Sequence, residues 1–177
     1  MKKTLAILLL IISFFIVYFL QSNIFTWFTI GGVMPNLYVI YVLFIGLFVK
    51  KKYGFFLGMA FGLYLDVIFG KTVGISTILF GIIGILGEIF SKNFSKDSRL
   101  TIMLMVMGVT VFYEVFAYVI NTIINQTAWE ILPFIRILLV EVIFNTLLTI
   151  ILYPLMKRLG YKLEEIFGDK ISLTRYF

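Results

Sequence analysis

The sequence contains no cysteine and no histidine, and these two absences remove several kinds of chemistry. Without cysteine the chain can form no disulfide, no thiolate nucleophile and no thiolate metal site. Without histidine it can form no Ser-His-Asp triad, no histidine-ligated zinc site and no axial histidine ligand for haem. A metal site made of carboxylates alone is left open, but nothing in the sequence supports one. We therefore expect no enzyme activity, no cofactor and no metal centre.

Charged residues are also scarce, since they make up 14% of the 177 residues, whereas a soluble protein averages about 25%. Hydrophobic residues make up 62%, and the mean hydropathy is +1.09. So few charges cannot cover so much apolar surface in water, which excludes a water-soluble globular domain. Disorder is excluded too, because it requires low hydrophobicity and high charge. The class that is left is an integral membrane protein.

Apolar segments long enough to cross a bilayer, which takes about 17–25 residues, occur six times along the chain. We predict an all-α integral membrane protein, a six-transmembrane-helix bundle that forms a single polytopic domain over residues 1–177. The first segment is expected to stay as a helix, because its apolar run is too long for a signal peptide and no small-residue cleavage site follows it. The predicted spans are residues 4–21, 31–49, 54–70, 74–90, 100–124 and 133–156.

The basic residues predict the orientation, because Lys and Arg accumulate in the cytoplasmic segments next to spans. With the N-terminus inside, Lys71 alone falls in an outer segment and Arg136 falls within the sixth span. We therefore predict that both termini are cytoplasmic. The net charge of +6 then reflects membrane topology and does not indicate nucleic-acid binding. The inner basic residues are Lys2, Lys3, Lys50, Lys51, Lys52, Lys92, Lys96, Arg99, Lys157, Arg158, Lys162, Lys170 and Arg175.

A ladder of small residues follows one side of the third predicted span. Four residues turn a helix by about 400°, so residues at this spacing share a face. Glycines on such a face let a neighbouring helix approach closely. We favour packing within the bundle, and a surface for a partner or ligand is the alternative. The glycines of this face are Gly54, Gly58, Gly62 and Gly70, and Gly81 and Gly84 repeat the design on the fourth span.

Ionisable side chains within the spans need partners, because a charge inside a membrane is costly. Asp66 and Arg136 are predicted at similar depth near the outer face, and an ion pair between them is our preferred hypothesis. A Glu141–Arg136 pair is the competitor, although a spacing of five residues is poor within one helix. Glu88 lies near the cytoplasmic end of its span and can reach the interface.

The other intramembrane polar residues are Glu114 on the fifth span, and Glu141 and Asn145 on the sixth. We favour a structural role, in which these groups hold helices together by hydrogen bonds. A path for protons or ions is the functional alternative, because acids inside a membrane often mark such paths.

Two further segments are irregular. Pro35 and Asn36 are expected to interrupt the start of the second span, and the segment from Lys157 is expected to form a short interfacial helix or a docking strip for a cytoplasmic partner.

The stretch MPNLYVIYVLFIGLF, a short basic turn and YGFFLGMAFGLYLDVIFGKTVGISTILFG together resemble the rod-shape-determining MreD family. In that family a proline-containing start to the second span precedes a glycine-ladder helix that ends in Gly-Leu-x-x-Asp, and a further glycine follows the turn. The resemblance covers essentially the whole chain. The matching positions are Pro35, Asn36, Leu37, Gly54, Gly58, Gly62, Leu63, Asp66 and Gly74.

The resemblance implies a non-enzymatic component of the cell-elongation complex in the bacterial cytoplasmic membrane. Such a protein binds the single-span protein MreC and couples cytoskeletal MreB to the synthases of lateral peptidoglycan. It also implies a fold similar to the substrate-binding subunits of energy-coupling-factor vitamin transporters, so a transporter subunit is the alternative function. Those subunits carry an Ala-x-x-x-Ala face on their first span, where this chain has only Ala6, and we therefore favour the shape-determining role.

Overall fold

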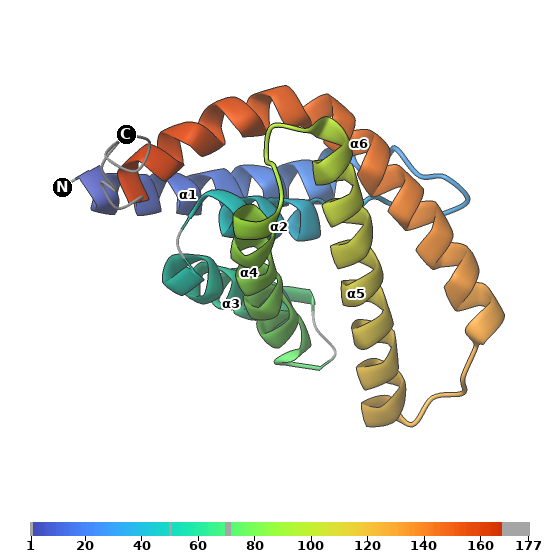
Figure 1. Ribbon diagram of the computed structural model, residues 1–177. Coiled ribbons are helices and arrows are strands. Elements are labelled where there is room, and N and C mark those ends of the chain that lie inside the picture. The colour runs from blue at the N-terminus through green and yellow to red at the C-terminus, as the bar shows by residue number, and fades with distance from the viewer. Residues whose placement is uncertain (1, 50, 70–71, 168–177) are drawn as a thin grey trace.

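The chain folds into six α-helices, and the computed structural model describes all residues except 1, 50, 70–71 and 168–177 (Figure 1). The described residues contain no β-strand, so the prediction of an all-helical membrane protein is confirmed. A π-helical turn, η1 (Leu20–Ile24), follows the first helix. The α-helices are α1 (Lys2–Phe19), α2 (Leu37–Phe48), α3 (Lys51–Phe69), α4 (Ile75–Asn93), α5 (Arg99–Asn125) and α6 (Ile131–Phe167).

Five of these helices are long and apolar enough to cross a membrane, and α2 is not. Its 12 residues rise only about 18 Å, against a hydrocarbon core of about 30 Å. The prediction of a second helical span over residues 31–49 is therefore wrong for its first six residues. Gly31 and Gly32 adopt left-handed φ values of 61° and 82°, and Pro35 disfavours helix in the residue before it. The predicted interruption at Pro35 and Asn36 is confirmed.

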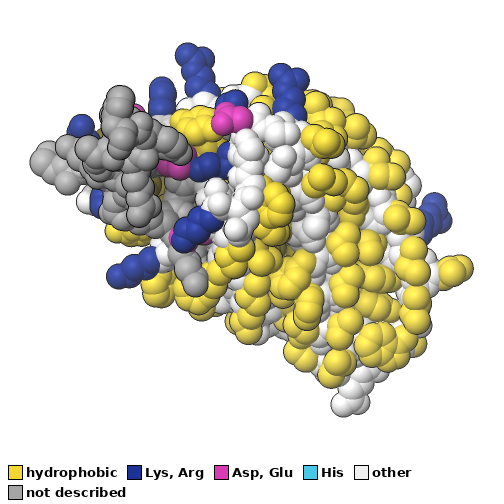
Figure 2. All heavy atoms as spheres, in the orientation of Figure 1, with side chains coloured by type: hydrophobic (Ala, Val, Ile, Leu, Met, Phe, Trp, Pro, Cys, Tyr) yellow, Lys and Arg dark blue, Asp and Glu magenta, His cyan; other side chains and the backbone are white. Residues whose placement is uncertain are grey.

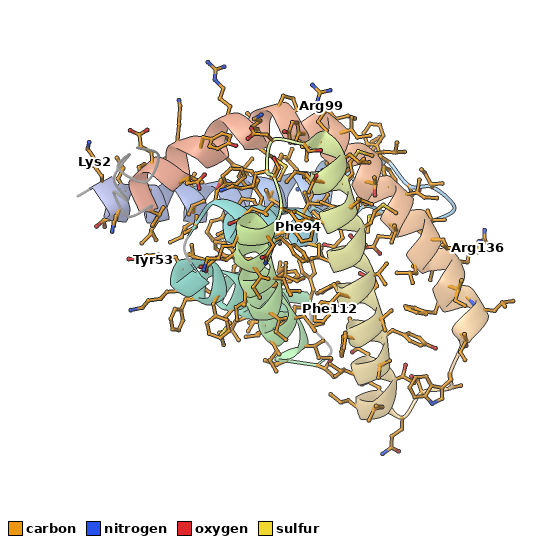
Figure 3. All side chains as sticks on the ribbon, viewed as in Figure 1. Lys2, Tyr53, Phe94, Arg99, Phe112 and Arg136 are labelled. Carbon is orange, nitrogen blue, oxygen red and sulfur yellow. The ribbon has the colours of Figure 1, made fainter. Side chains whose placement is uncertain are left out.

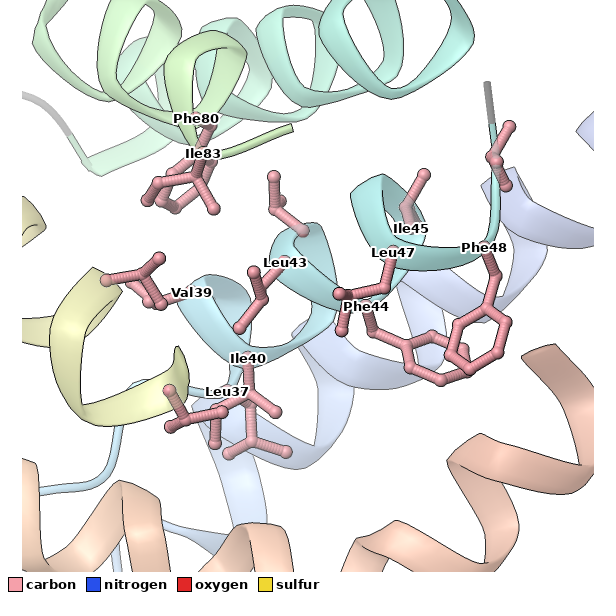
Figure 4. Close-up of a cluster of buried hydrophobic side chains, with 14 of the residues drawn as sticks. Leu37, Val39, Ile40, Leu43, Phe44, Ile45, Leu47, Phe48, Phe80 and Ile83 are labelled. Atoms are coloured by element: carbon pink, nitrogen blue, oxygen red, sulfur yellow. The ribbon is translucent and has the colours of Figure 1, made fainter. Parts of the chain in front are cut away.

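The core of the molecule is built around α2, in which every residue except Tyr38 and Tyr41 is buried. Figure 4 shows this cluster, where Phe80 and Ile83 of α4 lie next to the side chains of α2. Helix α4 packs on both α2 and α3, and α5 packs on α6. The first helix joins the core through Phe14, whose ring stacks on that of Phe61 in α3 at a centroid distance of 4.1 Å.

Helix α6 is longer than predicted, because it continues past the predicted end of the sixth span at residue 156 as far as Phe167. It contains Pro154, which removes one backbone hydrogen bond and permits a bend, and Figure 1 shows the helix as an arch. The segment from Lys157 is thus part of a continuous helix and does not form a separate one. Gly160 faces the ring of Phe48, and Phe167 is fully buried.

The surface is divided between charge and apolar side chains. In Figure 2, Lys and Arg gather towards the end of the molecule that holds the start of α1, and apolar side chains cover much of the rest of the visible face. Figure 3 places Lys2 at that end and Arg136 near the start of α6, far from it. This separation is what the predicted topology requires, and the location of both termini in the cytoplasm stays a prediction.

Candidate functional site

Helices α3 and α4 form a pair in which the two backbones touch. A Cβ atom added to Gly58 would meet the carbonyl oxygen of Phe80, and one added to Gly62 would meet Ser76 and come within 2.6 Å of the Thr77 Cα atom. These contacts are possible only because glycine has no side chain. The glycine ladder of α3 therefore faces α4, and Gly70, its last expected member, lies outside the described residues.

The same kind of contact continues along α4 and reaches α2. A Cβ atom on Gly84 would meet the carbonyl oxygen of Gly54 on α3, and one on Gly87 would lie 2.7 Å from the Gly46 Cα atom on α2. Gly81 differs, because a Cβ atom there would first meet the side chains of Met59 and Phe55. Gly46 and Gly87 were not identified from the sequence. Glycines therefore tie α2, α3 and α4 into one tightly packed unit.

Asp66 caps the start of α4 and so closes the α3–α4 pair. Its carboxylate accepts hydrogen bonds from the backbone N–H groups of Gly74 at 2.9 Å, Ser76 at 3.1 Å and Thr77 at 2.9 Å, and from the Thr77 hydroxyl at 2.8 Å. These N–H groups have no partner within α4, since they belong to its first turn. Gly74 adopts a φ of 110°, a left-handed conformation that glycine adopts without strain.

The hypothesis of an Asp66–Arg136 ion pair is wrong. Asp66 is 3% exposed and is fully engaged by α4, and no ion pair joins the two residues among the described part of the chain. Arg136 instead lines a pocket of about 600 Å³ with Ile30, Val33 and Leu132. The competing Glu141–Arg136 pair is also absent from the described residues. Asp66 bonds to the first turn of α4 because the end of α3 and the start of α4 lie next to each other in the helix pair.

Polar side chains satisfy the backbone where α2 begins. The N–H group of Asn36 donates to Asn145 Oδ1 at 2.7 Å, and that of Leu37 donates to Gln21 Oε1 at 2.9 Å. Gln21 Nε2 in turn donates to the Pro35 carbonyl at 2.8 Å, and Asn36 Oδ1 accepts from Val39. Non-helical backbone at membrane depth is tolerated where protein groups replace the missing hydrogen bonds. Gln21 was not identified from the sequence, although it is the last residue of the first predicted span.

A cluster of buried polar side chains lies beside this break and joins α5 to α6. Asn145 is fully buried and donates to the hydroxyl of Thr110 on α5 at 3.1 Å. Glu114 lies one turn after Thr110 on α5, and Glu141 lies one turn before Asn145 on α6, so the Thr110–Asn145 hydrogen bond brings the two carboxyl groups to neighbouring positions on the facing helices. We call Glu114 and Glu141 the carboxyl pair.

Ionic contacts at the opposite end hold the loop between α4 and α5 to α6. Asp97 bonds to Lys157 at 2.7 Å and to the Tyr161 hydroxyl at 3.0 Å, and Lys96 bonds to Glu164 at 2.7 Å. The Lys157 ammonium holds the pKa of the Asp97 carboxyl below its usual value, and the Tyr161 hydroxyl adds to this effect. Glu88 pairs with Lys92 one turn further along α4 at 2.7 Å, and its location near the membrane surface stays a prediction.

Internal packing accounts for most residues of the family-type motif. Pro35 and Leu37 are buried at the start of α2, Asn36 caps that helix, and Gly74 precedes α4. Leu63 is different, because it is 48% exposed on the side of α3 that faces away from α4. No group of three or more Asp, Glu, His or Cys side chains that could hold a metal ion occurs within the described residues.

Comparison with known families gives one match. The model of the family described as rod shape-determining protein MreD matches residues 1–163 of the chain. No curated protein and no solved structure matches the chain. The expected likeness to the substrate-binding subunits of vitamin transporters therefore stays a prediction.

Proposed function

The chain belongs to the MreD family of rod shape-determining proteins, and from this premise we propose that it works in the cell-elongation complex of the bacterial cytoplasmic membrane. In this proposal it binds the single-span protein MreC and thereby couples MreB to the synthases of lateral peptidoglycan. The observation that carries the proposal is the family match over residues 1–163. MreD is a family of shape-determining proteins and is not a known enzyme family, which supports a role in assembly.

The free side of α3 supports the binding of a partner helix. Phe56, Ala60, Leu63 and Val67 are exposed on it, with spacings of four, three and four residues. This is the spacing with which one helix packs along another. The opposite side of α3 is occupied by α4 through the glycine contacts, and this side is open to a second helix. We propose that the single membrane span of MreC packs along this stripe.

Cell shape tests the role. Deleting the gene in its rod-shaped host should produce rounded cells, and a plasmid copy of the chain should restore rods. The tagged wild-type chain should co-purify with MreC from detergent-solubilised membranes. A deletion strain that kept its width, or a wild-type chain that captured no MreC, would remove the proposal.

A matched pair of variants tests the binding surface. Leu63→Trp places a bulky ring on the free side of α3, and Leu104→Trp makes the same change at a residue of α5 that is 58% exposed. Both variants should keep the wild-type thermal midpoint, because neither residue is buried. Only Leu63→Trp should lose MreC and round the cells. If both variants captured MreC as the wild type does, the contact would lie elsewhere on the molecule.

A further inference from the structure

Glu114 and Glu141 occupy positions that correspond to the middle of a membrane crossed by α5 and α6, both of which are long and apolar enough to span one. Glu141 is ten residues after the start of α6, and Glu114 is eleven residues before the end of α5. At about 1.5 Å per residue, each lies about 15–17 Å from the loop that joins these helices, which is half of a hydrocarbon core of about 30 Å. An ionisable residue at this depth is costly and is normally kept for a function.

The surroundings of the carboxyl pair contain no cation. The neighbouring polar groups are already bonded to one another, since Asn145 donates to Thr110 and accepts from the N–H group of Asn36. Glu141 is only 6% exposed, and its Oε1 atom is buried without a hydrogen-bond donor. No Lys or Arg of the described chain forms an ion pair with either acid. The nearby ionisable groups are Tyr113 on α5 and Asp66 on α3, neither of which brings a positive charge.

Two ionised carboxylates cannot share such a site without a large penalty, because like charges repel strongly where water is excluded. Each carboxylate is also only an acceptor, so a contact between two of them contains no donor. One proton removes both difficulties, since it supplies the donor and leaves a single negative charge. That charge fits the position of the pair, which lies one turn from the Asn145–Thr110 contact at the start of α2, where the helix carries a partial positive charge.

We propose that the carboxyl pair is a proton-binding site, in which Glu114 and Glu141 hold one proton between them and so join α5 to α6 beside the start of α2. The ligand is a proton. This site is independent of the contact proposed for MreC, which uses the free side of α3. Either proposal can therefore fail while the other stands.

Infrared spectroscopy of the purified chain in lipid nanodiscs tests the site directly. The wild type at neutral pH should show the carbonyl band of one protonated carboxyl group per chain. Glu114→Gln and Glu141→Gln should each abolish this band and keep the wild-type thermal midpoint, because the glutamine amide donates the hydrogen bond that the proton provided. Glu88→Gln is the control and should leave the band in place, since Glu88 is paired with Lys92.

Two further measurements keep the proposal open to refutation. Replacing sodium chloride with choline chloride should not change the band, and a band that sodium removes would show a metal-cation site instead. A hydrophobic carbodiimide, which reacts with protonated carboxyl groups, should modify Glu114 or Glu141 of the wild type and spare Glu88, as mapped by mass spectrometry. This experiment needs no variant to fold. Absence of the band in the wild type, or its survival in both single variants, would overturn the proposal.

Discussion

Alanine at Gly62 should force α3 away from α4, and this is the most direct test of the glycine-packed pair. The added Cβ atom would lie 2.6 Å from both the Ser76 carbonyl carbon and the Thr77 Cα atom. Carbon atoms pack at about 3.5–4.0 Å, so the two backbones must separate by roughly 1 Å. No rotamer change can relieve the contact, because both obstacles are backbone atoms.

The expected magnitude is a balance of two terms. Overpacking of a tight core costs about 1–3 kcal/mol, and alanine is favoured over glycine within a helix by about 0.5–1 kcal/mol. The net expectation is a loss of about 1–2 kcal/mol in the free energy of unfolding. The separation also pulls Ser76 and Thr77 away from Asp66, which accepts hydrogen bonds from both.

Gly108 provides the matched control, because a Cβ atom there would have nothing within 4 Å. Gly108→Ala changes the same atom in another long helix and should keep or raise the thermal midpoint. Thermal unfolding of the wild type and both variants in one detergent should therefore give shifts of opposite sign, or a loss for Gly62→Ala alone. Equal midpoints for Gly62→Ala and Gly108→Ala would refute the packing argument.

Three further outcomes follow from the hydrogen bonds and ion pairs. Asp66→Ala should lower the free energy of unfolding by more than about 1–3 kcal/mol, the usual cost of one unsatisfied buried group, because several N–H groups lose their acceptor; a wild-type thermal midpoint would contradict this. Asn145→Leu should cost about 1–3 kcal/mol, because the N–H group of Asn36 loses its acceptor, and an unchanged midpoint would show that another group replaces it. The contact of Asp97 with Lys157 should be lost as the pH falls below about 4. The pKa of Asp97 is lowered in the folded state, so the contact stabilises above the unfolded pKa and weakens as Asp97 is protonated. The protection of the amides at the end of α6 against hydrogen exchange, relative to the intrinsic rate at each pH, should fall with acid in the wild type, and Asp97→Asn should lack that change.

Hydropathy predicted the long helices well because it measures how residues partition into lipid. It cannot detect a change of backbone conformation within an apolar segment, which is why the second span was expected to start at residue 31. The left-handed glycines at 31 and 32 and the proline at 35 hold that part of the chain out of a helix. The polar partners that make this possible, Gln21 and Asn145, are distant in sequence, so spacing alone could not join them to Asn36.

The partner of Asp66 was mispredicted for a different reason. Depth in the membrane suggested Arg136, but depth does not determine which helices are neighbours. The first turn of α4 begins only nine residues after Asp66 and presents free N–H groups. The spacing of the glycines, by contrast, correctly suggested close helix packing on α3 and α4 and left open which helices meet.

The break at the start of α2 explains some intramembrane polar residues and not others. The N–H groups of Asn36 and Leu37 are satisfied by Asn145 and Gln21, so the backbone of this break does not require an acid. Thr110 in turn satisfies the Asn145 amide. Glu114 and Glu141 lie beside this network, and two ionised carboxylates can only accept hydrogen bonds. Their proximity therefore costs free energy and forms no hydrogen bond unless they share a proton. Fold stability alone therefore gives no reason for the carboxyl pair, and proton binding gives one.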